Sequence, residues 1–308
     1  MMQYQQPFNT GAFFKNLLLG RSMLSRLILI NTVVFLAINF VSLIMYLSGM
    51  GTTGITGLSA VGRYLALPSN IDLLGSMPWT IFTYMFTQEG FFHLLFNLVM
   101  LYFGGMIFLE YLSEKKLLST YLMGGIVGAV FFIAAFNLFP VFQNVASEAV
   151  AIGASASVLA IFIAIATYVP DYTVHLFLFG RIKMKYIAIA FIAIDLLSIQ
   201  DGNPGGHIAH LGGALWGFVY ALQLKKGTDI YKIFDWFRKP LTETRKSSMK
   251  FSTNRPKNSK PMSDVEYNTK RVATQEEIDK ILDKIGKSGY ASLSANEKEL
   301  LFKSSNKK

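Results

Sequence analysis

Cysteine is absent from this 308-residue chain, and charge is scarce. Without cysteine the chain has no disulfide, no thiol nucleophile and no thiolate metal ligand. Charged residues make up 16% of the sequence, against about 25% in an average soluble domain, whereas apolar residues make up 52%. This composition excludes a single ordinary cytosolic domain.

Charge is also distributed unevenly along the chain. Residues 1–224 hold 9 Lys and Arg against 8 Asp and Glu, whereas residues 225–308 hold 20 against 11. The net charge of +10 therefore comes as +1 from the first part and +9 from the second. We expect a hydrophobic body followed by a basic, water-soluble tail.

Long apolar runs in the first part indicate membrane helices, because about 20 consecutive apolar residues cross a bilayer. Six windows stand out, of which the fifth is the shortest: Leu27–Leu47, Phe91–Leu109, Leu117–Phe139, Ala149–Val169, Met184–Ile199 and His207–Leu224. The first run is too long for a signal peptide, and no small-residue cleavage site follows it. The sequence therefore predicts an all-α polytopic membrane protein, a bundle of six transmembrane helices.

Basic residues beside these windows predict the orientation, because cytoplasmic loops carry an excess of Lys and Arg. One set of flanks carries Lys15, Arg21, Arg26, Lys115, Lys116, Arg181, Lys183, Lys185, Lys225 and Lys226. The opposite flanks, roughly residues 48–90, 140–148 and 200–206, carry only Arg63. This alternation predicts six spans with the N- and C-termini both in the cytoplasm.

These patterns divide the chain into four parts. We expect a cytoplasmic N-terminal segment at 1–24 and the six-helix body at 25–224, in which residues 48–90 form an apolar outer loop. Residues 225–271 are rich in Lys, Arg, Ser, Asn and Pro, which predicts a basic flexible linker. Residues 272–308 are expected to form a small cytoplasmic helical hairpin.

The expected hairpin follows from two apolar patterns. Ile278, Ile281, Leu282 and Ile285 recur at helical spacing, and a second helix is expected over Ala295–Lys303. The basic charge of the hairpin favours binding to an anionic membrane surface. Binding to a cytoplasmic partner is a further possibility. We expect no nucleic-acid partner, because no base-reading motif is present.

Polar side chains inside apolar spans are costly, so they are candidates for function. Four groups stand out: His93 with Asn97, Gly153 to Ser157, Asp195, and His207 with His210. Each has a structural alternative. Ser155 can be a packing residue and Asn97 can bridge two helices. Asp195 could be a proton relay, but near the outer end of its helix it is expected to reach water or a helix N-terminus. The two late histidines could bind a metal, but no third ligand stands at a suitable spacing, so we expect no metal and no cofactor.

Depth in the membrane connects three of these groups. Windows two, four and six run in the same direction. His93 and Asn97, Ser155, and His210 each lie within about two turns of a window's start. They are therefore expected at one level, in the outer half of the membrane. A serine with a histidine and further hydrogen-bond donors is suited to nucleophilic acyl transfer. Asn97 and His93, with the backbone N–H at Ser155, could hold the oxyanion.

Taken together, these motifs resemble the rhomboid family of intramembrane serine proteases. The matching pieces are H-x-x-x-N at His93–Asn97, G-x-S-x at Gly153–Ala156 and A-H-x-x-G-x-x-x-G at Ala209–Gly217. G-x-x-x-x-E at Gly105–Glu110 and the aromatic-rich stretch Pro78–Phe86 also match. The resemblance covers roughly residues 25–224.

The resemblance implies a Ser–His dyad without a third carboxylate. By position, Ser155 is the nucleophile and His210 is the base and acid, and His207 is the weaker candidate because it falls where the pattern has glycine. His93 and Asn97 correspond to the residues that stabilise the oxyanion. The family cleaves single-span or polytopic membrane proteins in or near a transmembrane segment, so its members act in the lipid bilayer. Residues 200–206 and the fifth span are the moving cover that the resemblance suggests.

Two positions depart from the family pattern. Ala156 follows the serine where the family often has glycine, and Leu159 stands where many members carry an aromatic under the base. Alanine keeps the backbone N–H groups, so we expect activity to survive. Leucine can pack but cannot stack, which leaves the orientation of His210 less tightly set.

The sequence leaves three functions to compare. The first is an intramembrane serine endopeptidase, and the second is an inactive rhomboid-like protein that binds membrane clients. The third is a six-span transporter, for which inverted repeats and buried acids would be expected; Asp195 and Glu110 are the candidate acids, and no repeat is evident. Since both dyad residues are present, the sequence favours the protease, which we expect in a bacterial inner membrane.

Overall fold

The structure is a computed structural model that describes residues 20, 22–50, 58–176, 180–200, 202–229, 278–285 and 288–305. The chain divides into two compact units, Met1–Lys239 and Pro240–Lys308. Nearly all of the expected N-terminal segment, and the expected linker from residue 230 onwards, lie outside the described residues.

The first unit contains six helices of 14 residues or more among the described residues. They are α2 (Met23–Leu47), α6 (Phe91–Tyr111), α7 (Glu114–Leu138), α8 (Ser155–Tyr168), α9 (Met184–Leu197) and α10 (Pro204–Lys225). Local signals set their ends. Ser22 accepts a hydrogen bond from the Ser25 N–H and caps α2, and α10 has Pro204 in its first turn after the capping residue Asn203.

Three of the described helices, α2, α6 and α7, are long and apolar enough to cross a membrane. α8 is a shorter apolar helix, and its 14 residues rise about 21 Å. Large apolar side chains point outward along α2, including Val33, Leu36 and Phe40, whose exposed fractions are 53 to 64%. Such faces belong in lipid rather than in water. The six-span count stays a prediction.

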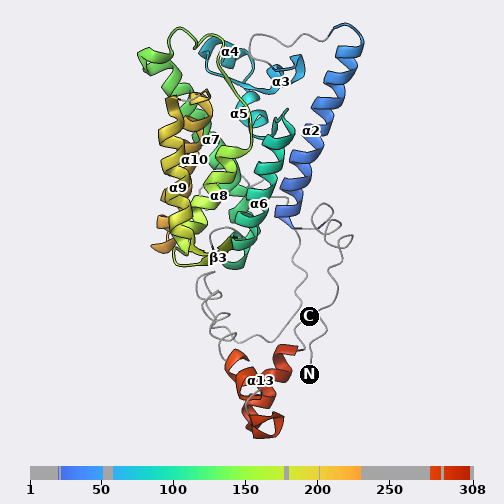
Figure 1. Cartoon of the computed structure of the whole chain (residues 1–308), viewed down its shortest axis with the longest axis vertical. Helices are drawn as coiled ribbons and strands as arrows, with labels where there is room; N and C mark the ends of the chain where they lie inside the picture. The colour runs from blue at the N-terminus through green and yellow to red at the C-terminus, as the bar shows by residue number, and fades with distance from the viewer. Residues whose placement is uncertain are drawn as a thin grey trace, which may run out of the picture. The chain divides into compact units, whose positions relative to one another are not determined.

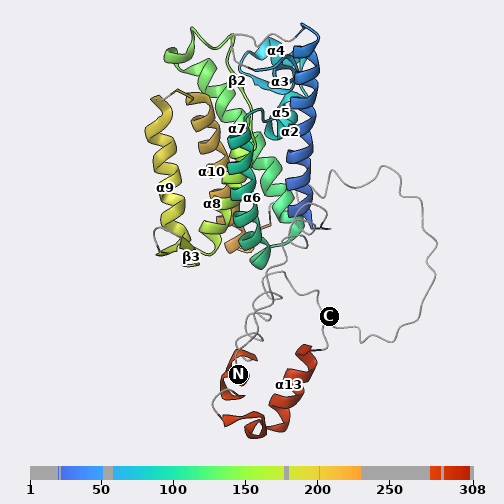
Figure 2. The same cartoon turned by 45° about the vertical axis from the view of Figure 1, so that its right-hand side comes forward.

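α8 occupies the middle of this unit and starts about halfway along its height (Figures 1 and 2). It packs most closely against α10, and also against α7 and α6. Small residues permit the close approach. A Cβ added at Gly213 would lie 2.1 Å from the Ala156 carbonyl oxygen, and one added at Gly217 would lie 2.2 Å from that of Ala160. The G-x-x-x-G pattern therefore marks a contact of helix backbones.

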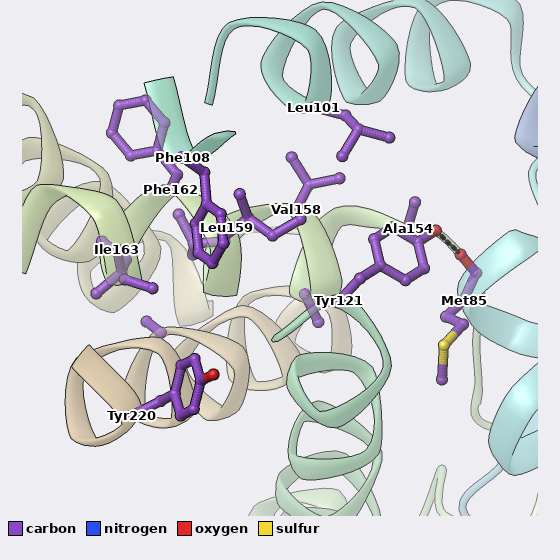
Figure 3. Close-up of a cluster of buried hydrophobic side chains, with 14 of the residues drawn as sticks. Met85, Leu101, Phe108, Tyr121, Ala154, Val158, Leu159, Phe162, Ile163 and Tyr220 are labelled. Atoms are coloured by element: carbon purple, nitrogen blue, oxygen red, sulfur yellow. Dashed lines mark hydrogen bonds between the residues drawn. The ribbon is translucent and has the colours of Figure 1, made fainter. Parts of the chain in front are cut away.

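A cluster of buried apolar side chains surrounds α8. Val158, Leu159 and Phe162 of this helix lie among Leu101 and Phe108 of α6, as Figure 3 shows. Tyr121 of α7 is fully buried and donates its hydroxyl hydrogen to the Met85 carbonyl oxygen at 2.9 Å. The core thus fixes α8 against the helices that carry the other polar groups of interest.

The expected outer loop is structured where it is described. Residues 58–90 contain α3 (Ala60–Leu65), β1 (Leu67–Pro68), α4 (Ile71–Ser76), α5 (Thr80–Thr83) and the 3₁₀ turn η1 (Tyr84–Phe86). Further 3₁₀ turns are η2 (Pro140–Phe142) and η3 (Ser198–Gln200). α3 and α4 gather at one end of the unit, beside the C-terminal end of α2 (Figures 1 and 2).

The fourth apolar window differs from its expected form. Its first residues form a strand, β2 (Val150–Ala151), which pairs antiparallel with β1, Leu67 opposite Ala151. Helix α8 starts only at Ser155, because Gly153 has a φ of +123° and interrupts the helical backbone. Apolar composition did not separate this strand from the helix that follows it. A second pair, β3 (Thr173–Leu176) and β4 (Gly180–Lys183), links α8 to α9.

The second unit contains helix 278–285, the 3₁₀ turn η4 (Tyr290–Ser292) and α13 (Ala295–Ser305). Ser294 and Glu297 form a capping box, in which each backbone N–H donates to the other residue's side chain. Lys284 donates to Glu297 at 2.9 Å and joins the two helices. The Lys284 hydrogen bond and those from Ser294 lower the pKa of Glu297 to about 2.

Candidate active site

Ser155 is the first residue of α8, directly after a turn that requires glycine. The Gly153 N–H donates to the Tyr84 carbonyl oxygen at 2.9 Å, and its φ of +123° is unfavourable for any residue with a Cβ. A Cβ there would also lie 2.7 Å from Cε1 of His93. The G-x-S motif therefore sets a turn that puts Ser155 at a helix N-terminus, where backbone N–H groups lack intrahelical partners.

The Ser155 hydroxyl lies next to His210 of α10. Ser155 Oγ and His210 Nε2 are 2.6 Å apart, across 55 residues of sequence. The packing of α8 on α10 through Gly213 and Gly217 makes this approach possible. His210 is partly buried, with 24% of its side chain exposed. The pair has the geometry needed for proton transfer between a hydroxyl and an imidazole.

Asp195 of α9 lies on the other side of His210. Its Oδ1 is 2.8 Å from Nδ1 of His210 and also 2.8 Å from Nδ1 of His207. The carboxylate side chain is 9% exposed. The expectation that Asp195 reaches water or a helix N-terminus was wrong, because α9 packs against α10 and turns the carboxylate toward both histidines.

The same three residues also offer metal-ligand atoms. One atom each from Asp195, His207 and His210 lies within 4.8 Å of the others. Asp195 therefore offers the third ligand atom, which the spacing of residues in the sequence did not suggest. The two 2.8 Å distances are ordinary for hydrogen bonds, so a proton on each Nδ1 accounts for the arrangement.

The two residues expected to hold an oxyanion flank the same place. Asn97 lines a cavity of about 190 Å³ together with Ser155, His210 and Asp195. The rest of its lining is apolar: Phe96, Met100, Val158, Leu159, Phe191 and Ile194. His93, one turn before Asn97 on α6, lies against Gly153. The structure brings all four predicted site residues together, and Leu159 lines the cavity.

Gln88 lies outside the sequence motifs, yet its side chain holds Asn97. The Asn97 amide donates to Gln88 Oε1 at 2.7 Å, and Gln88 Nε2 donates to Asn31 Oδ1 at 3.0 Å. Asn31 in turn donates to the Tyr121 hydroxyl at 3.1 Å. Gln88 and Asn31 are fully buried. This network links α2, the segment before α6, α6 and α7, and it orients the Asn97 amide; the signal was a strongly polar residue just before an apolar window.

We predict that Gln88→Leu destabilises the protein. Leucine has a similar size but cannot hydrogen-bond, so the buried Asn31 oxygen and one Asn97 N–H lose their partners. Each buried unsatisfied group costs about 1–3 kcal/mol. Thermal unfolding in detergent measures the loss. Gln143→Leu is the control because Gln143 is exposed; equal unfolding temperatures for the two variants would contradict the structural importance of the network.

Two known protein-family models match parts of this chain. A family model described as "Rhomboid domain" matches residues 75–227, the part that contains α5 to α10. The chain belongs to the rhomboid family. The rhomboid domain and the three apolar helices together indicate an integral membrane protein. A second model, described as a family of unknown function, matches residues 263–307.

A curated relative of this rhomboid chain is "RHOMBOID-like protein 12, mitochondrial" from Arabidopsis thaliana. The two are 28% identical over 157 residues, which are 48% of this chain and 47% of the relative. The chain therefore matches about half the length of that protein. The similarity supports membership of the rhomboid family and leaves the activity to be argued from the site.

Proposed function

We propose that this protein is an intramembrane serine endopeptidase that cleaves transmembrane proteins in or near their membrane span. The observation that carries the proposal is the 2.6 Å distance between Ser155 Oγ and His210 Nε2. A serine held by packing alone has no need of an imidazole at this distance. Rhomboid family membership supports the assignment.

The chemistry follows from the two side chains. His210 Nε2 accepts the Ser155 proton while Oγ bonds to the scissile carbonyl carbon. The imidazolium then gives that proton to the leaving amine nitrogen as the C–N bond breaks, which leaves an acyl-enzyme. A water molecule attacks the ester with His210 again as base, and Ser155 regains its proton when the ester bond breaks.

Negative charge on the carbonyl oxygen needs hydrogen-bond donors that are already in place. The backbone N–H of Ser155 at the start of α8 is one candidate. The Asn97 amide has two hydrogens, of which one suffices for Gln88, and His93 lies beside Gly153. We assign oxyanion stabilisation to Asn97 and His93 together with this N–H.

The proposed substrate is a peptide segment in extended form, because a helical carbonyl is hydrogen-bonded and shielded. The apolar lining of the cavity, from Phe96 to Ile194, suits an apolar side chain of such a segment. We further propose six spans with both termini in the cytoplasm, because the basic residues flank alternate ends of the apolar windows. Residence in a bacterial inner membrane stays a prediction.

Labelling with a serine-reactive fluorophosphonate tests the proposal. We expect the purified chain in detergent to become labelled at Ser155 and to cleave a model single-span substrate, because an activated hydroxyl attacks phosphorus as it attacks a carbonyl. The folded protein remaining unlabelled and inactive on several single-span substrates would contradict the proposal. That result would favour a rhomboid-like protein that binds membrane clients without cleaving them.

A further inference from the structure

We infer that Asp195 is a positioning residue for the base, so that this chain uses a Ser–His–Asp triad where the family resemblance implies a dyad. The inference rests on the proposed function. The observation behind it is a continuous line of hydrogen-bonded atoms from Ser155 Oγ to His210 Nε2, and from His210 Nδ1 to Asp195 Oδ1. Three helices, α8, α10 and α9, each contribute one member.

The carboxylate decides which ring nitrogen of His210 carries the proton. An ionised carboxylate can accept hydrogen bonds but cannot donate them. At 2.8 Å from Asp195 Oδ1, the His210 Nδ1 must therefore be the protonated nitrogen. Nε2 of the neutral ring is then an acceptor, which is the form that can take the Ser155 proton. Without the carboxylate the two tautomers would be free to exchange.

The carboxylate also stabilises the charge that forms during the reaction. When Nε2 takes the Ser155 proton, the ring becomes a cation with Nδ1–H still pointing at Asp195. Oδ1 lies 2.8 Å from that nitrogen, and the carboxylate side chain is 9% exposed, so solvent screens the attraction little. Asp195 neither gains nor loses a proton in this scheme.

His207 holds the carboxylate from the opposite side. Its Nδ1 also lies 2.8 Å from Asp195 Oδ1, and it stands one turn before His210 on α10. By the same reasoning its Nδ1 carries a hydrogen, so two N–H groups converge on one oxygen. The second donor limits rotation of the carboxylate and fixes Oδ1 opposite His210. This accounts for the pair of histidines without a metal.

Asp195→Asn tests the role in the full-length protein. Asparagine has the same shape, but its NH₂ group can donate to His210 Nδ1 and thereby hold the tautomer in which Nε2 is protonated and cannot act as base. In a soluble serine protease the equivalent change lowers kcat by about 10⁴-fold. We expect kcat to fall at least about 100-fold and KM to change less than about 3-fold. EDTA is present throughout, so a bound metal plays no part.

Asp171→Asn is the matched control, because Asp171, between α8 and β3, is 65% exposed and pairs with Lys183 of β4 and Lys185 of α9. It should retain parental kcat. An Asp195→Asn enzyme with parental kcat would overturn the inference while leaving the proposed function intact. A parent protein without activity would instead overturn the proposed function.

The tautomer itself can be measured in the parent protein. The chain has four histidines, so ¹⁵N-histidine NMR of the parent, with His210→Gln to assign its signals, can resolve the ring nitrogens. We expect a protonated Nδ1 and an unprotonated Nε2 at His210 near neutral pH. A neutral ring protonated at Nε2 would overturn the inference.

Discussion

Ser155→Ala and His210→Ala are each expected to lower cleavage of a single-span substrate below detection. The serine variant has no nucleophile, and the histidine variant has no group to take the serine proton. In a soluble serine protease, loss of either residue costs about 10⁶-fold in kcat. Initial rates of substrate cleavage in detergent or lipid vesicles measure the effect, with folding followed by thermal denaturation.

Two neighbouring residues serve as controls for this prediction. Ser157→Ala removes a hydroxyl two residues further along α8, where the side chain is fully buried near Gly125, and it should remain active. His207→Ala should lose far less activity than His210→Ala. The His207 ring is hydrogen-bonded to Asp195, whereas the ring beside the Ser155 hydroxyl is that of His210. Parental activity in His210→Ala with none in His207→Ala would mean that the base is His207.

Gly213→Ala is expected to reduce both stability and turnover. The added Cβ would lie 2.1 Å from the carbonyl oxygen of Ala156 and 2.8 Å from its carbonyl carbon. Because these are backbone atoms, no change of rotamer relieves the collision, and α8 and α10 must move apart. Overpacking of this kind costs about 1–3 kcal/mol. The same movement separates Ser155 from His210, and a misplacement of about 1 Å can cost about 100-fold in rate.

The measurements are the unfolding temperature in detergent and kcat on a model substrate. Gly75→Ala in α4 is the control, because a Cβ at Gly75 would meet nothing within 4 Å. If Gly213→Ala matched this control in both measurements, the close contact of α8 and α10 would not be needed for the site.

The sequence predicted the helical body and the candidate residues well, because these depend on local patterns. Apolar runs marked α2, α6 and α7, whose observed bounds lie within a few residues of the expected ones. The motifs H-x-x-x-N and G-x-S-x and the second histidine of α10 identified residues that the structure brings together. These residues can be recognised from the sequence because each motif places polar residues inside an apolar run.

What the sequence did not reveal depends on tertiary packing. Asp195 is 15 residues from His210, and nothing in a helical pattern says that its carboxylate turns toward α10 rather than toward water. Gln88 acquires its importance from Asn31, which is 57 residues away. β2 was hidden in an apolar run because pairing with β1, and not composition, makes it a strand. Six spans and the protease activity remain predictions.

The late start of α8 bears on how water would reach the proposed site. α7 has 25 residues and rises about 38 Å, whereas α8 has 14 and rises about 21 Å. α8 begins about halfway along the height of the unit (Figures 1 and 2), so in a bilayer its first residue would lie below the level that α7 reaches. Hydrolysis within the hydrocarbon layer would then depend on where one helix begins, and bilayer thickness would become a natural regulator of its rate.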